Sequence, residues 1–210
     1  MYGIITDRDT IKKYIKYDKC EDEDEVFDKQ FREWRCNLRL GREIYISTED
    51  MPRKLRKGEY VCIRPGEFVL FLTRETLRLD PDVMAFISIR FDYKQKGLVN
   101  VSGFHVDPNY KGRLIFSAYN AGPKDIVLKD ADAVFMIFFQ KMEKACKEDH
   151  EGYDHIPAEM VEQIRGKSAT LAANAHRLER LEFYLKIIGG IVVALLMTIV
   201  GVAIKEFFRR

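Results

Sequence analysis

The residues best suited to chemistry lie together in one turn of sequence DPNYKG. It carries a carboxylate (Asp107), an aromatic ring (Tyr110) and a cation (Lys111). The flanking residues 99–106 and 115–119 are rich in β-branched and aromatic side chains, which predicts a strand, a tight turn and a second strand. Such a turn can present its three polar groups to a nucleotide, although an ordinary surface turn has the same composition.

The elements around this turn are predicted to be short strands. Gly, Pro, Asp and Lys separate them, and no helix alternates with them, which favours a barrel or sandwich. The predicted strands are residues 43–47, 60–63, 67–73, 83–90, 98–106, 113–119, 126–128 and 133–140. Ahead of them, residues 6–17 predict an amphipathic helix capped by Thr6, and the charged residues 20–35 predict a loop or helix.

The C-terminal part of the sequence changes character. Residues 158–186 predict one helix, in which Ile164, Leu171, Leu178 and Leu185 recur every seven residues. This spacing fits either a coiled coil or one amphipathic helix lying on the barrel, and both interpretations stay open.

Residues 187–204 form an uncharged apolar segment. At 1.5 Å per residue they extend about 27 Å, close to the hydrocarbon thickness of a bilayer. We therefore expect a barrel domain at 1–145, a linker and helical stalk at 146–186, a single transmembrane helix at 187–204 and a short basic tail at 205–210. The barrel is expected in the cytoplasm, although the basic tail favours the opposite orientation.

Composition narrows the partners. The chain has 35 basic and 33 acidic residues and a net charge of +2, so nothing indicates a nucleic-acid partner. The four cysteines form no CxxC pair, and no metal site is predicted. The N-terminus lacks the apolar stretch of a signal peptide, which predicts free thiols in a reducing cytosol.

Several short motifs, in one order, resemble the dUTPase and dCTP deaminase superfamily, and are most similar to dCTP deaminase-like proteins. The similarity covers roughly residues 3–140. The motifs are NLRLG (37–41), PGEFVL (65–70), LDPDVMA (79–85), the segment 89–98 at the place of the family's GRSSLARLGL, and the DPNYKG turn. The resemblance implies a mainly β, dUTPase-like distorted barrel or jelly roll with an N-terminal helix. It also implies a homotrimer that binds a pyrimidine deoxynucleotide between subunits, with Mg²⁺ on the phosphates and no cofactor held by protein ligands.

The phosphate motif of the family is only partly present. Arg90 matches its first arginine, whose planar guanidinium suits phosphate oxygens. The two serines that should follow are Phe91 and Asp92, and a carboxylate would repel phosphate. The later arginine falls on Gln95, and Lys94 beside it supplies part of the lost charge.

The catalytic motif is also incomplete. Asp107 matches the aspartate that activates water in dUTPases, and Tyr110 matches the aromatic residue that stacks on the deoxyribose. The glutamate that shuttles a proton in the deaminases falls on Ser117, which is a poor general base. The glycine-rich arm of the dUTPases is replaced by the C-terminal helix.

These matches and losses favour a membrane-anchored protein that binds a pyrimidine nucleotide without family catalysis and acts as a sensor or effector. An active dCTP deaminase tethered to a bilayer, and a purely structural trimeric anchor, are the alternatives. The candidate catalytic residues are Asp107 and Ser117, the latter expected to be inactive. The candidate nucleotide-binding residues are Arg90, Asp92, Lys94, Gln95, Asp107 and Tyr110.

Overall fold

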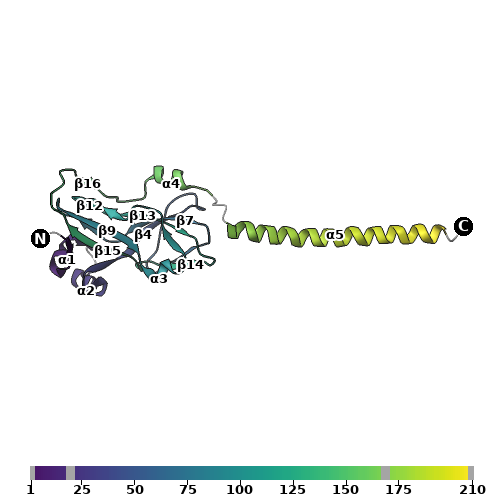
Figure 1. Cartoon of the computed structure of the whole chain (residues 1–210), viewed down its shortest axis with the longest axis horizontal. Coiled ribbons are helices and arrows are strands. Elements are labelled where there is room, and N and C mark those ends of the chain that lie inside the picture. The colour runs from purple at the N-terminus through teal and green to yellow at the C-terminus, as the bar shows by residue number, and fades with distance from the viewer. Residues whose placement is uncertain (1–2, 18–21, 167–170, 208–210) are drawn as a thin grey trace. The chain divides into compact units, whose positions relative to one another are not determined.

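The computed structural model describes residues 3–17, 22–166 and 171–207 of the chain. The chain divides into two compact units, Met1–Ser168 and Ala169–Arg210. In Figure 1 the first unit runs from purple to green and contains the strands, and the second is a single long helix.

The secondary structure is mainly β, with helices near both ends of the chain. The helices are α1 (Arg8–Tyr14), α2 (Glu23–Gln30), α3 (Phe91–Lys94), α4 (Ala158–Ile164) and α5 (Leu171–Phe207). The strands are β1 (Gly3–Ile5), β2 (Ile15–Lys16), β3 (Phe31–Arg32), β4 (Arg35–Ile46), β5 (Arg53–Lys54), β6 (Tyr60–Ile63), β7 (Phe68–Thr73), β8 (Thr76–Arg78), β9 (Val83–Ile89), β10 (Leu98–Asn100), β11 (His105–Val106), β12 (Tyr110–Gly112), β13 (Ile115–Asn120), β14 (Ile126–Lys129), β15 (Ala133–Lys141) and β16 (His150–Glu151).

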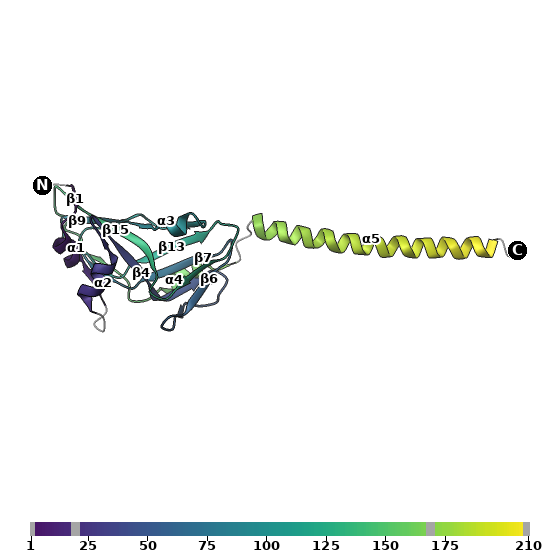
Figure 2. The same cartoon turned by 90° about the horizontal axis from the view of Figure 1, so that it is seen from below.

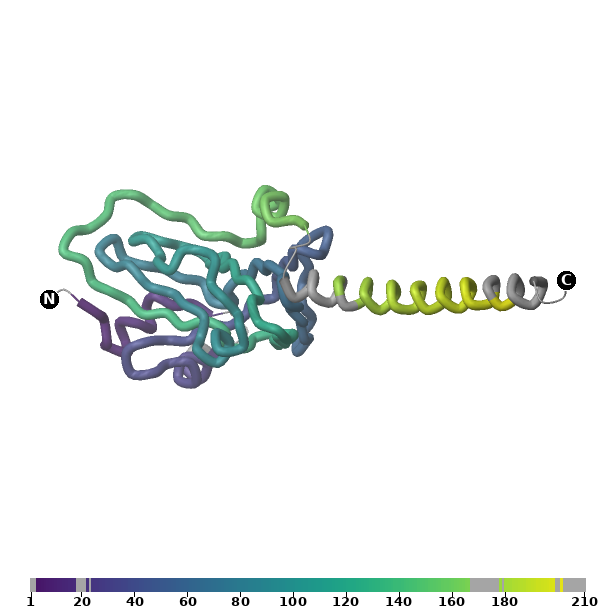
Figure 3. Tube along the Cα trace, turned by 45° about the vertical axis from the view of Figure 1, so that its right-hand side comes forward, coloured from purple at the N-terminus to yellow at the C-terminus, as the bar shows by residue number. Residues whose placement is uncertain are grey.

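The strands form one large curled sheet and two smaller ones. The large sheet follows the order β10-β13-β7-β4-β15-β9-β11, with β1 pairing with β15, and with β3 and β5 pairing with β4. A second sheet has the order β16-β12-β8-β2, and β6 pairs with β14 in a two-stranded ribbon. The curl is visible in Figure 3. The predicted fold class is confirmed in its architecture, which is mainly β with a curled sheet and helices near both ends.

Alternating burial along the strands builds the core. In β9 the side chains of Val83, Ala85, Ile87 and Ile89 point inward and are almost completely buried, because successive strand residues face opposite sides of a sheet. The Phe135 ring lies at the centre of the aromatic packing, 4.8 Å from the Phe116 ring and 5.8 Å from the Phe71 ring, between ring centroids.

Two local predictions were wrong. The cap of α1 is Asp7 and not Thr6, because the Asp7 carboxylate accepts the Thr10 backbone N–H at 2.9 Å. Residues 98–106 are not one strand: β10 pairs with β13, whereas β11 pairs with β9. These two partners lie at opposite ends of the curled sheet, so residues 101–104 must cross between them. The DPNYKG turn therefore does not close a simple hairpin.

The predicted continuous helix at 158–186 is also interrupted. α4 ends at Ile164, its C-cap Arg165 has an extended backbone, and Gly166 follows with φ of 146°, a conformation that favours glycine. The end is held by an Arg165–Asp50 ion pair of 2.5 Å and by the Gly166 N–H, which donates to the Ser47 carbonyl at 3.0 Å. Residues 167–170 lie outside the described part.

The second unit contains one helix that is long and apolar enough to cross a membrane by length and composition. This candidate span is Arg180–Thr198, 19 residues with a mean hydropathy of 1.9. It overlaps the segment 187–204 that the sequence predicted. The coiled-coil interpretation of the preceding leucines stays a prediction.

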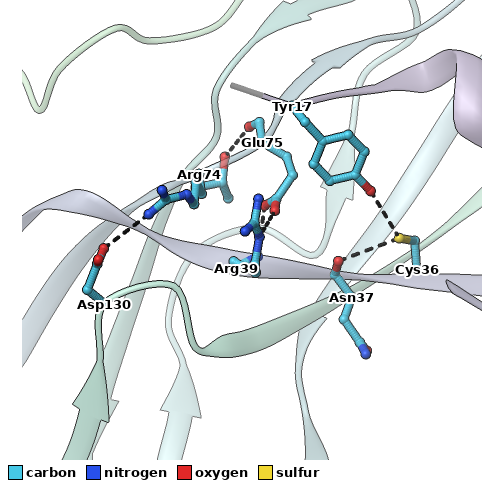
Figure 4. A network of polar contacts seen from close by, with 8 residues as sticks. Tyr17, Cys36, Asn37, Arg39, Arg74, Glu75 and Asp130 are labelled. Carbon is cyan, nitrogen blue, oxygen red and sulfur yellow. Dashed lines mark hydrogen bonds and ion pairs between the residues drawn. The ribbon is translucent and has the colours of Figure 1, made fainter. Parts of the chain in front are cut away.

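A buried ion pair joins β4 to the turn after β7 (Figure 4). The Arg39 Nε lies 2.6 Å from a Glu75 carboxylate oxygen, and the Arg39 backbone N–H donates to the other oxygen at 2.8 Å. Glu75 is fully buried, and burial raises the pKa of its carboxyl group while the Arg39 guanidinium opposes that rise. Beside the pair, burial raises the pKa of the Cys36 thiol to about 12, which makes this thiol inert at neutral pH.

The NLRLG motif has a structural explanation. Leu38 and Leu40 are buried in the core, and Arg39 between them reaches Glu75. A Cβ atom at Gly41 would lie only 2.4 Å from the Leu72 carbonyl oxygen, at the irregularity in the β4–β7 pairing. Glycine is therefore required where the two backbones approach each other.

We predict that Arg39→Met lowers the free energy of unfolding by about 3–5 kcal/mol, because it leaves the Glu75 carboxyl buried without its partner. The double variant Arg39→Met/Glu75→Leu should recover much of this loss, since neither charge is then buried. Urea unfolding of the single and double variants measures the coupling. Lys29→Met, which breaks the exposed Lys29–Glu25 pair, is the control and should change little. Additive effects of the two buried substitutions would contradict the prediction.

Candidate nucleotide site

Arg90 stands where β9 ends and α3 begins. Its backbone N–H donates to the Val134 carbonyl at 2.9 Å, which fixes it to β15, and its carbonyl accepts the Tyr93 N–H at 3.0 Å. One guanidinium nitrogen donates to the Ala133 carbonyl at 3.0 Å. The side chain is 32% exposed, so part of its hydrogen-bonding fork still faces solvent.

Asp92 already binds the solvent-facing nitrogen of the Arg90 guanidinium. Its carboxylate lies 2.7 Å from the second terminal nitrogen of Arg90. Asp92 is more exposed than Arg90, at 59%, and Phe91 next to it is 73% exposed. The carboxylate therefore takes the position at which an incoming anion would contact the guanidinium.

Lys94 and Gln95 have different surroundings, because Lys94 binds β9 whereas Gln95 lines a pocket. The Lys94 ammonium donates to the Ser88 hydroxyl at 2.7 Å, back along β9. Gln95 caps the C-terminus of α3 and contributes to a half-open pocket of about 480 Å³. The pocket is lined by Gln95, Lys96, Pro123, Lys124, Asp125 and Val127.

The sequence analysis did not predict that Lys124 belongs to this pocket. Residues 95–96 line one side of the pocket and residues 123–125 and 127 line the other, and the two segments meet because Gly97 lies against Gly122. A Cβ atom at Gly97 would lie 2.4 Å from the Gly122 Cα, and the Gly97 carbonyl accepts the Ala121 N–H at 2.9 Å. In the sequence, Gly97 follows a lysine and Gly122 precedes a Pro-Lys pair, and these glycines could have drawn attention to both segments. The pattern around each glycine does not, however, indicate that the two segments are in contact.

Asp107 lies in the turn after β11. Its carboxylate is about half exposed, and the His105 imidazole lies beside it, with 3.5 Å between Nε2 and Oδ1. Asn109 adopts a positive φ of 59° in this turn, and its N–H donates to the Asp80 carbonyl at 3.2 Å. Asp107 can thus accept a hydrogen bond from a ligand or a water molecule.

Tyr110 is buried, with only 8% of its surface exposed. Its hydroxyl donates to the Arg113 carbonyl at 2.8 Å, and β12 pairs with β16, which brings His150 beside it. Burial raises the pKa of the Tyr110 phenol, so it stays neutral. A Cβ atom at Gly152 would lie 2.6 Å from the tyrosine oxygen. The ring is therefore covered by the chain segment that follows β15.

Ser117 lies in the middle of β13, opposite Leu70 of β7. Its side chain is half-buried on the face opposite to the core residues Phe116 and Ala118. Its N–H donates to the Ser102 hydroxyl at 3.3 Å, and its carbonyl accepts the Val101 N–H at 3.0 Å. A serine hydroxyl needs a neighbouring base to be activated.

The two halves of the candidate site lie at opposite ends of β9. The register of β11 against β9 places Asp107 next to position 84, and Arg90 follows the last residue of the strand. At about 3.4 Å per residue, Arg90 and Asp107 are therefore roughly 20 Å apart within one chain. The structure brings together Arg90, Asp92, Lys94 and Gln95 around α3, and Asp107 and Tyr110 in the distant turn.

Among residues 3–17, 22–166 and 171–207, with side chains considered where they are described, no group of three or more His, Cys, Asp or Glu is arranged to hold a metal ion.

Comparison with known proteins supports the same fold. A family model described as dCTP deaminase-like matches residues 5–142. The chain belongs to the dCTP deaminase-like family. It is 31% identical to a dCTP deaminase of Pyrococcus abyssi over 116 residues, which cover 55% of this chain and 73% of the relative. It is also 30% identical to a dUMP-forming dCTP deaminase of Dictyoglomus thermophilum over 160 residues, covering 66% and 80% of the two chains.

A solved family structure confirms the likeness in three dimensions. The crystal structure of 2′-deoxycytidine 5′-triphosphate deaminase from Agrobacterium tumefaciens superposes with a TM-score of 0.55 at 16% identity. The match covers 67% of this chain and 49% of that chain, so this chain spans about half its length. At this identity the likeness shows the fold alone.

We predict that Asp92→Asn increases the affinity for inorganic tripolyphosphate, because the substitution removes a negative charge from the Arg90 guanidinium. Removing one repulsive charge at a half-exposed site should strengthen binding by about three- to tenfold. Isothermal titration of the full chain measures it. The double variant Arg90→Ala/Asp92→Asn is the control and should lose the gain. Equal affinities for the parent and Asp92→Asn would contradict the prediction.

Proposed function

We propose that this family member binds a pyrimidine deoxynucleotide at a membrane without deaminating it, and acts as a sensor or effector. The observation that carries the proposal is the contrast between the two halves of the site. A cationic half remains around Arg90, whereas the position of the family's proton-shuttling glutamate is held by Ser117. General acid–base catalysis contributes about 10²–10⁴-fold to such rates, so its loss removes most of the chemistry.

The proposed site is shared between copies of the chain in a homotrimer. Arg90 and Asp107 of one copy are too far apart to contact one nucleotide, so a site that uses both needs Arg90 from one copy and Asp107 from another. A closed ring of three copies would repeat this pairing three times. Tyr110 would support the turn from beneath, since its ring is buried by its own chain.

In the proposed complex the phosphates lie near α3. Arg90 and the lysines of the pocket supply the positive charge, with Asp92 displaced from the guanidinium. Mg²⁺ would arrive on the nucleotide phosphates, because the described residues offer no acidic cluster to hold it independently. The half-exposed Asp107 carboxylate would accept a hydrogen bond from the sugar or base.

Membrane attachment is the second part of the proposal. The candidate span Arg180–Thr198 would cross the bilayer once, with the β-domain in the cytoplasm. Nucleotide binding would change how the β-domains of neighbouring copies pack against each other. Residues 167–179 would then transmit this change to the membrane spans.

An active dCTP deaminase tethered to a bilayer is the second candidate function, favoured by the identity of about one third to a dCTP deaminase. It requires another group to replace the missing glutamate. A purely structural trimeric anchor is the third candidate, and it requires neither Arg90 nor Asp107.

We predict that the full chain in detergent binds dCTP or dUTP with Mg²⁺ and releases no ammonia from dCTP. Arg90→Ala should weaken binding by about tenfold or more, because a charge-assisted phosphate contact is lost. Isothermal titration measures the affinity, and an ammonia assay at high protein concentration measures turnover. Ammonia release that Asp107→Ala abolishes would establish the deaminase instead. If the chain bound no pyrimidine nucleotide, the result would contradict the proposal and favour the structural trimeric anchor.

We predict further that two variants that each bind nucleotide poorly recover binding when they are mixed. When Arg90→Ala and Asp107→Ala chains are unfolded, mixed equally and refolded, about one quarter of the sites should carry both intact residues if neighbouring copies share them. Titration of the mixture should therefore recover about that fraction of the parent stoichiometry. Each variant refolded alone is the control. No recovery, with both variants folded, would place the whole site within one chain.

A further inference from the structure

The ribbon formed by β6 and β14 exposes a surface with mixed apolar and basic character. Alternation buries one face of the ribbon in the core, and the other face consists of Tyr60, Cys62, Val127 and Lys129. Tyr60 is 63% exposed and Val127 is 52% exposed. The Lys129 ammonium lies 5.5 Å from the centre of the Tyr60 ring, so the cation and the aromatic ring form one unit.

The loop before β6 adds three exposed cations to this surface. A pocket of about 490 Å³ is lined by Lys54, Arg56, Lys57, Gly58 and Glu59. The acidic member, Glu59, already has two partners, because its carboxylate accepts the Arg53 guanidinium at 2.7 Å and the Arg56 backbone N–H at 2.8 Å. Among the side chains that the structure describes, no carboxylate forms an ion pair with Lys54, Arg56 or Lys57. The positive charge of the loop is therefore available to a partner.

The C-terminal end of the first unit lies in the same half of the domain as this basic surface. Arg165 and Gly166 are bound to Asp50 and Ser47, in the loop that leads to β5. Figures 1 and 2 place β6 and β14 away from α1 and α2, which lie at the other end of the domain. The segment 167–179 then leads to the candidate span at Arg180. Its 13 residues reach at most about 45 Å, which limits how far the end of the first unit can lie from a span in a bilayer.

We propose that Lys54, Arg56, Lys57, Tyr60, Val127 and Lys129, together called the basic ribbon, dock on a bilayer of anionic phospholipids. Basic residues are attracted to negatively charged headgroups, and long cationic side chains extend toward the phosphates while their stems cover apolar surface. Tyrosine is suited to the boundary between headgroups and acyl chains. The inference rests on the membrane attachment in the proposed function, and it adds the face that meets the bilayer and the lipid class.

The test uses residues 1–166, which contain the entire buried core and are compared by thermal unfolding to verify that each variant is folded. Binding is measured by co-sedimentation with vesicles of phosphatidylserine and phosphatidylcholine in equal amounts, and with phosphatidylcholine alone. We expect binding to the anionic vesicles only. Lys54→Gln/Arg56→Gln/Lys57→Gln should weaken it by about tenfold or more, since each basic residue at the surface contributes substantially.

The matched control is Lys13→Gln/Lys16→Gln/Lys29→Gln, which removes the same charge from α1, β2 and α2, and it should bind as the parent does. Equal losses in both triple variants would show a general charge effect and overturn the proposal, as would absence of binding to anionic vesicles. Tighter binding of the basic ribbon to a duplex oligonucleotide than to the vesicles would also overturn it. Titration of dCTP into the full-length parent and the full-length Lys54→Gln/Arg56→Gln/Lys57→Gln variant separates the two proposals, because nucleotide binding should be the same in both.

Discussion

The contact between Arg39 and Glu75 is the constraint on which much of this β-domain depends. A fully buried carboxylate is tolerated because it receives both a guanidinium and a backbone N–H from one residue. The pair ties β4, the long central strand, to the turn between β7 and β8, and Gly41 lets the same two segments approach within backbone contact. A misplaced β4 would leave this carboxylate without a partner, so the pair penalises alternative registers. The sheet that positions both halves of the candidate site is built on this strand and its neighbours.

The length of β9 shapes the functional site. Arg90 and the α3 cations stand at one end of the strand, and the Asp107 turn stands at the other. Neither half is a complete binding site for a nucleotide, and the α3 half is partly neutralised by Asp92. The proposed function rests on this contrast, a cationic half around Arg90 and Ser117 at the place of the proton shuttle, which would suit a protein that recognises its ligand and leaves it unchanged. The Gly97–Gly122 contact adds a lysine-lined pocket beside α3, which offers extra charge near the place proposed for the phosphates.

The proposed membrane attachment would give a physical reason for the surface composition of the domain. The exposed face of β6 and β14 and the cationic loop before β6 lie in the half of the domain from which the chain continues to its apolar helix. Charged residues elsewhere on the surface are mostly interleaved in sign, as in the pairs of α1 and α2 with each other. A cationic loop beside exposed tyrosine and valine is a different arrangement, and an anionic bilayer is the environment that matches both of its components.

The amino-acid sequence alone determined the family, the mainly β fold class, the order of most strands and an apolar segment near the end, because local alternation, turn residues and colinear motifs carry that information. From the sequence we also predict that Arg90, Asp107 and Ser117 decide the chemistry, and this stays a prediction. Only the tertiary structure showed that residues 98–106 divide between two edges of the sheet, that Asp92 binds Arg90, and that Tyr110 is covered by β16. It also brought Lys96 and Lys124 to one pocket. These features depend on contacts between residues that are distant in the chain or on the local direction of a side chain, and neither is encoded in the periodicity of a single segment.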